Sequence, residues 1–108
     1  QPNKSLGNGK PKMKVKPNQK ILFYDGTPLL DENKKEILVR DAIINAINAI
    51  DSSDENVDKG KIFEISMKMY KNEEEIELSV EDRAFILKRA EKTLIPVVYG
   101  RIKEILET

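Results

Sequence analysis

The spacing of apolar residues near the start of the chain predicts short strands. In residues 21–30, ILFYDGTPLL, two apolar runs flank Asp25-Gly26, a pair that tolerates the positive φ angles of a tight hairpin turn. Pro28 cannot donate to a strand ladder, so the second strand is expected to be an edge strand or irregular. Residues 36–39, a glutamate followed by three apolar residues, form a third run that could be a short strand paired with residues 21–24. An N-terminal β-hairpin of two or three short strands is therefore predicted.

From Arg40 onward the apolar spacing lengthens to about 3.6 residues, the period of an α-helix. Residues 40–50 carry a broad apolar face that should be central to the core: Ala42, Ile43, Ala46, Ile47, Ala49 and Ile50. Residues 57–71 fit both strand alternation and a helix face. Their length and their Met, Lys and Glu content favour a helix, capped by Ser53 or Asp54.

Two further helices are predicted toward the C-terminus. Ser79 begins Ser-Val-Glu-Asp, in which the hydroxyl can accept a hydrogen bond from the amide of residue 81 or 82, so a helix over 80–92 is expected. Its apolar stripe is Ala84, Phe85, Leu87, Ala90 and Leu94, with Ile86 alongside. Pro96 lacks an amide donor, so it either begins a new helix or kinks one continuous helix, and we favour a break near Leu94-Ile95. Gly100, inside that last helix, costs about 1 kcal/mol relative to alanine, which predicts the close approach of another backbone.

These elements predict a mostly helical α+β fold, with an N-terminal β-hairpin followed by about four helices around one core. A single globular domain is expected over residues 21–108. Residues 1–20 combine Gly, Asn, Pro and Lys with few large apolar side chains and are expected to be a disordered basic tail. Met13, followed by KVKPNQK, looks like a native start, so residues 1–12 are expected to be vector-derived.

The sequence contains neither cysteine nor histidine, which restricts its chemistry. Thiolate chemistry, nearly all transition-metal sites and the common nucleophile-base pairs are excluded. No cofactor-binding glycine loop is present, so no catalytic residue, cofactor or metal ligand is assigned and no enzymatic activity is expected. No apolar run approaches the roughly 20 residues that span a bilayer. The expected location is the cytoplasm.

The net charge of zero hides opposite charges at the two ends of the chain. Residues 1–24 carry six lysines and no acid, so Lys14, Lys16 and Lys20 are candidates for weak contact with nucleic acid. Residues 72–82, NEEEIELSVED, could instead form a carboxylate-based active site or small-ligand site. A solvated turn followed by a capped helix explains the same residues, and we favour it.

Two groups of side chains are candidates for binding a partner protein. Tyr99 and Arg101 belong to the residue types favoured as interface anchors. Met67 and Met69, with Tyr70, could form an adaptable groove, although such a stripe is more often part of a core.

The order of segments resembles small proteins of unknown function encoded in tailed-phage and prophage genomes. The resemblance covers roughly Met13 to Glu107 and is carried by FYDGTPLLD, RDAIINAINAI, MKMYKN, IELSVED and IPVVYGRIKEILE. It implies a phage setting and favours a helix over 57–71, and it supplies no catalytic residue.

The function expected from the sequence is that of a non-enzymatic phage or prophage accessory protein that binds a host or phage protein, with a homodimer also open. One alternative is a nucleic-acid-binding regulator that uses the basic N-terminal tail. The second is a carboxylate-based enzyme or small-ligand binder.

Overall fold

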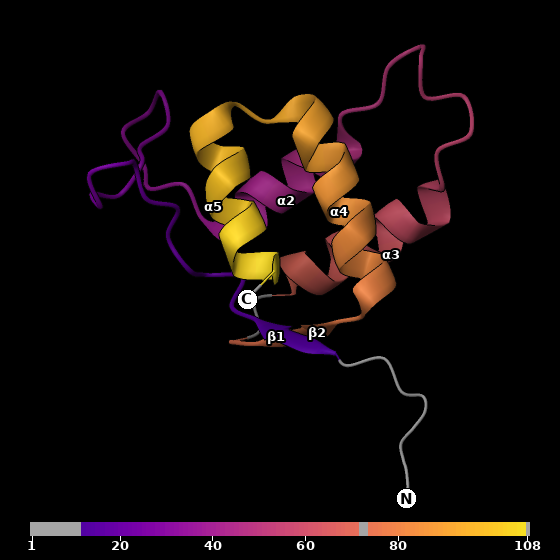
Figure 1. The fold of residues 1–108 in the computed structure, drawn as a ribbon, viewed down its shortest axis with the longest axis horizontal. Coiled ribbons are helices and arrows are strands. Elements are labelled where there is room, and N and C mark those ends of the chain that lie inside the picture. The colour runs from indigo at the N-terminus through magenta and orange to yellow at the C-terminus, as the bar shows by residue number, and fades with distance from the viewer. Residues whose placement is uncertain (1–11, 72–73, 108) are drawn as a thin grey trace, which may run out of the picture.

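The computed structural model describes residues 12–71 and 74–107 and has the predicted mostly helical α+β fold (Figure 1). The elements in chain order are β1 (Met13–Val15), α2 (Val39–Asn48), α3 (Lys59–Tyr70), β2 (Ile76–Leu78), α4 (Val80–Thr93) and α5 (Pro96–Glu107). The four helices lie over a small sheet, and a long connection before α2 stands apart from them (Figure 1).

Helix α2 is central because it packs against α3, α4 and α5. Its apolar face buries Ala42, Ile43, Ala46 and Ile47, as the 3.6-residue spacing predicts. The prediction that Ala49 and Ile50 continue this face is wrong, since the helix ends at Asn48 and both residues are exposed.

The sheet joins two segments that are distant in sequence. Strand β1 pairs antiparallel with β2, with Met13 opposite Leu78 and Val15 opposite Ile76. The prediction of a disordered tail is therefore wrong for residues 13–20, where Val15 and Pro17 are fully buried. Tertiary contacts with β2 supply the burial that the local sequence lacks. Residues 1–11 lie outside the described part of the chain.

The predicted hairpin is present as a set of single bridges and hydrogen bonds instead of continuous strands. The amide of Phe23 donates to the carbonyl oxygen of Thr27 at 2.8 Å, closing a turn in which Gly26 has a φ of +88°. The third run also pairs as predicted, because the Ile21 amide donates to the Ile37 carbonyl oxygen at 2.8 Å.

Helices α3, α4 and α5 lie where the sequence predicts them, with three corrections. The predicted apolar stripe of α4 is wrong at Ala84, which is exposed, whereas Ile86 is fully buried. The cap of α3 is Asp58, whose side chain accepts from the Lys61 amide at 3.0 Å; Ser53 and Asp54 lie too far upstream for this role. Helix α5 begins at Pro96, as predicted. The predicted close approach at Gly100 is wrong: apart from the adjoining backbone of α5, a Cβ built there meets no described atom within 4 Å.

Candidate functional site

The turn at residues 23–27 presents two aromatic side chains to solvent. Asp25 organises this turn, since its Oδ1 accepts from the Thr27 amide at 3.0 Å and from the Thr27 hydroxyl at 2.7 Å. The backbone hydrogen bond from Thr27 is the main cause that lowers the pKa of Asp25 below its ordinary value. Phe23 and Tyr24 are 42% and 70% exposed. Their rings meet edge to face, with centroids 5.1 Å apart. We call these two residues the aromatic tip.

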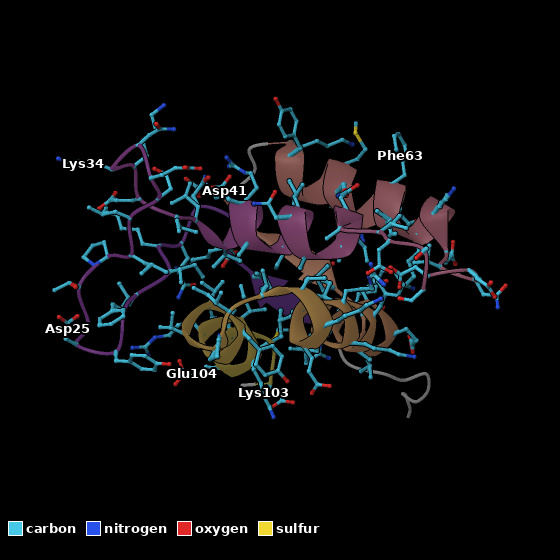
Figure 2. The ribbon with its side chains drawn as sticks, turned by 90° about the horizontal axis from the view of Figure 1, so that it is seen from above. Asp25, Lys34, Asp41, Phe63, Lys103 and Glu104 are labelled. Carbon is cyan, nitrogen blue, oxygen red and sulfur yellow. The ribbon has the colours of Figure 1, made fainter. Side chains whose placement is uncertain are left out.

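Arg101 on α5 donates hydrogen bonds to the backbone at the aromatic tip. Its Nε donates to the carbonyl oxygen of Leu22 at 3.0 Å, and its Nη2 donates to that of Phe23 at 2.7 Å. A third nitrogen, Nη1, pairs with Glu104 at 3.1 Å. Figure 2 places Asp25 at the far end of the turn, away from the helices, with Glu104 on the neighbouring helix α5. The planar guanidinium thus fixes the turn to α5 at two successive carbonyls.

The two residues predicted as partner anchors therefore have different surroundings. The guanidinium of Arg101 is committed to the backbone of the turn, so Arg101 positions the aromatic tip. Tyr99 is partly buried on α5. Residues two apart on a helix do not face the same way, so the structure does not place Tyr99 and Arg101 side by side.

Each lysine proposed for nucleic-acid contact lies near a carboxylate. Lys14 faces Glu77 across the sheet, and Lys20 forms a salt bridge with Glu36 at 3.2 Å. Lys16 lines the same surface hollow as Glu74 and Glu75. The structure does not bring these lysines together as a purely basic surface.

Two residues of the acid-rich run, Ser79 and Asp82, make contacts that stabilise the fold. The Oγ of Ser79 accepts from the Asp82 amide at 3.0 Å, which confirms the predicted cap of α4. The buried Asp82 carboxylate pairs with Lys61 Nζ at 2.9 Å. Burial raises the pKa of Asp82, but the hydrogen bond and charge of Lys61 outweigh it, so that pKa lies below its usual value. Asn72 and Glu73 lie outside the described residues.

A second buried charge cluster was not predicted. Arg89 is buried on α4 and donates to Asp54 Oδ1 and to the Ala49 carbonyl oxygen, each at 2.7 Å. Lys92 Nζ lies 2.7 Å from the same Asp54 oxygen. Hydrogen bonds from Arg89 and then Lys92 hold the pKa of Asp54 far below its usual range. We call these three residues the Asp54 clamp.

The Asp54 clamp borders a shallow surface hollow of about 690 Å³ between residues 53–58 and α4. Its lining mixes acids and bases with the apolar residues Val57 and Phe85. Arg89 and Lys92 both pair with Asp54, and Lys92 Nζ also lies 3.5 Å from Asp51, so the Asp54 carboxylate is already engaged by two cations. Within residues 12–71 and 74–107, no group of three or more acidic residues is placed to hold a metal ion.

The methionine stripe divides between the core and the surface. Met69 is fully buried, as expected of a core residue. Met67 and Tyr70 are exposed together with Phe63, and Tyr70 also lines a surface hollow with Asp41 and Ile44 of α2. We call Phe63, Met67 and Tyr70 the outer face of α3.

No helix in the described part of the chain combines the length and the apolar character that crossing a membrane requires. Comparison of the chain with protein-family models, curated proteins and solved structures finds no match.

Proposed function

We propose that this chain is a non-enzymatic binding protein that contacts a protein partner through the aromatic tip. The observation that supports this most strongly is the pairing of exposure with rigidity: Phe23 and Tyr24 are open to solvent, yet Arg101 and Asp25 fix the backbone beneath them. Exposed aromatic residues are enriched at binding hot spots. A preordered turn also loses little conformational entropy on binding.

A protein partner fits this surface better than nucleic acid does. Base stacking on Phe23 and Tyr24 would need cations nearby to neutralise phosphates. Lys20, the nearest of the three candidate lysines in sequence, is already paired with Glu36. Nucleic-acid binding remains the second candidate, and it predicts an affinity that falls steeply with salt.

The third reading, a carboxylate-based enzyme or small-ligand binder, has less support. Asp82 is buried against Lys61, and Glu77 faces Lys14 across the sheet, so both carboxylates have structural neighbours that explain them. The phage or prophage setting and the action in the host cytoplasm remain predictions from the sequence.

Affinity capture with three forms of the full chain tests the proposal. Wild-type bait should retain a protein from infected or lysogenic cells that Tyr24→Ala bait retains about tenfold less, because an exposed tyrosine hot spot is worth at least 1.4 kcal/mol or so. Ile95→Ala is the matched control, since Ile95 is an exposed apolar residue between α4 and α5. Equal retention by all three baits would contradict the assignment of the aromatic tip.

Arg101→Lys separates positioning from contact. Lysine keeps the positive charge but cannot donate to the Leu22 and Phe23 carbonyls in the same fork geometry. We expect weaker partner retention together with faster amide exchange at Phe23 and Gly26, whose hydrogen bonds close the turn. Weaker retention without faster exchange would indicate that Arg101 touches the partner directly.

A further inference from the structure

Helix α3 carries large apolar side chains on both of its sides. Its inner side buries Ile62, Ile65 and Met69. Outside this buried side Phe63, Met67 and Tyr70 are 67%, 41% and 74% exposed, with Tyr70 at the edge that borders α2. Figure 2 shows Phe63 pointing outward from α3, on the side remote from α2 and from Lys103 and Glu104.

The spacing of these three residues makes a continuous stripe. They follow each other at four and three residues, the spacing that aligns side chains along one face of a helix. Phenylalanine, tyrosine and methionine are the types most enriched in the cores of protein interfaces. The stripe spans most of α3, so a second helix could lie along it.

Charges beside the stripe indicate what that second helix is. Glu64 and Lys71 lie on the same edge of α3, seven residues apart, and both are exposed. The two nearby lysines of α3, Lys61 and Lys68, pair with Asp82, and the charge of Glu64 acts on Lys61 without forming a salt bridge in the described part of the chain. Met67 lies midway, with Phe63 and Glu64 before it and Tyr70 and Lys71 after it.

We propose that the outer face of α3 binds the same face of a second copy of this chain, with the two helices antiparallel about a two-fold axis near Met67. In this arrangement Phe63 of each copy packs against Tyr70 of the other. Glu64 of each copy lies beside Lys71 of the other, so two pairs of opposite charges form across the interface. A two-fold axis parallel to the helices would instead put this edge of the two copies on opposite sides of the interface, so that neither charge would meet its complement.

The dimer should be weak and concentration-dependent. A stable interface buries about 800 Å² on each partner. Helix α3 is 12 residues long, and such a helix extends only about 18 Å, so one stripe on it falls short of that area. Dissociation constants of about 10 to 100 μM are expected for the isolated chain.

Sedimentation equilibrium of the full chain over a concentration range tests the dimer. Met67→Glu places two carboxylates at the two-fold axis and should raise the dissociation constant at least about tenfold. Glutamate and methionine have similar helix propensities, so circular dichroism should show an unchanged fold. A wild-type chain that stays monomeric up to about 500 μM, five times the weakest affinity expected, would overturn the proposal.

Charge reversal tests the antiparallel register itself. Glu64→Lys or Lys71→Glu alone should weaken the dimer about fivefold, because each variant sets like charges against each other at two places. The double variant exchanges both charges and should restore wild-type affinity to within about twofold. Equal weakening by the single and double variants would overturn the antiparallel arrangement.

The proposed dimer uses the outer face of α3 and the proposed partner binding uses the aromatic tip. An experiment can therefore contradict one proposal without contradicting the other. Tyr24→Ala should leave the monomer-dimer equilibrium unchanged, and Met67→Glu should leave the aromatic tip intact. A dimer lost in Tyr24→Ala would move the self-contact from α3 to the aromatic tip and overturn this inference.

Discussion

Ser79 determines where α4 begins, because its hydroxyl oxygen satisfies the Asp82 amide at the first turn of that helix. Ser79→Ala should lower the free energy of unfolding by about 1 kcal/mol, measured by urea denaturation. Ser52→Ala is the control, since Ser52 is exposed in the loop before α3. A change at Ser79 within about 0.5 kcal/mol, the range of ordinary surface substitutions, would show that the cap contributes little.

Gly100 occupies a helical position that does not require glycine. Apart from the adjoining backbone of α5, no described atom lies within 4 Å of the position that a Cβ would take there, so Gly100→Ala should raise the free energy of unfolding by about 1 kcal/mol. Gly26→Ala should do the opposite, because Gly26 has a φ of +88° in the turn of the aromatic tip. Destabilisation by Gly100→Ala would reveal an approach by another chain at that face of α5.

At the scale of elements, the Asp54 clamp ties the loop before α3 to α4. Asp54 is a loop residue, and Arg89 and Lys92 are one helical turn apart on α4. The main chain of the loop joins the same cluster, because Arg89 also donates to the Ala49 carbonyl oxygen. The buried side chain of Arg89 on α4 therefore fixes the loop between α2 and α3.

The pH dependence of stability follows from the sign of the pKa shift at Asp54. Its folded pKa lies below the unfolded value, so its contribution is present at neutral pH and is lost as the pH falls below about 4. Asp54→Asn should therefore lower the melting temperature clearly at pH 7. The difference from wild type should shrink on acidification, as thermal denaturation at several pH values would show. A constant difference at every pH would contradict this role.

At the scale of the whole molecule, the two oppositely charged parts of the chain meet in the sheet. Strand β1 comes from the basic N-terminal segment and β2 from the acid-rich run, and Lys14 lies opposite Glu77. Opposite charges at facing positions stabilise an antiparallel pair. The charge asymmetry thus favours the register that buries Val15 and Leu78.

Val15→Ala tests whether the basic segment belongs to the folded unit. Removing most of a fully buried valine side chain should cost about 2 kcal/mol in the free energy of unfolding. The control is Lys12→Ala, because Lys12 is exposed just before the strand. An unchanged stability for Val15→Ala would restore the view of this segment as a disordered tail.

Local spacing predicted the helices well, because each buries one face against a common core. Pro96, the Ser79 cap and the Asp25-Gly26 turn act through neighbours in sequence, so they could be predicted as well. Strand β1 could not, since its partner lies about sixty residues away.

The contacts of the two arginines that matter most, Arg89 and Arg101, could not be predicted from their neighbours in sequence either. Charged residues are rarely buried, so nothing near Arg89 in sequence indicated its role; only the distant Asp54 explains it. Arg101 was singled out as an interface residue, but its contacts with Leu22 and Phe23 depend on tertiary structure. The sequence pattern groups Met67 and Tyr70 with Met69 in one stripe. Met67 and Tyr70 are exposed in the structure, whereas Met69 is buried.

The affinity of a purified captured partner for the wild-type chain and for Tyr24→Ala tests the central claim most directly. Isothermal titration at about 0.15 M and about 0.5 M salt should show a loss of at least about tenfold for Tyr24→Ala at both concentrations. Wild-type affinity should change little with salt. Equal affinity of Tyr24→Ala and wild type would contradict binding through the aromatic tip, and a steep fall with salt would show that charged contacts dominate the interface instead.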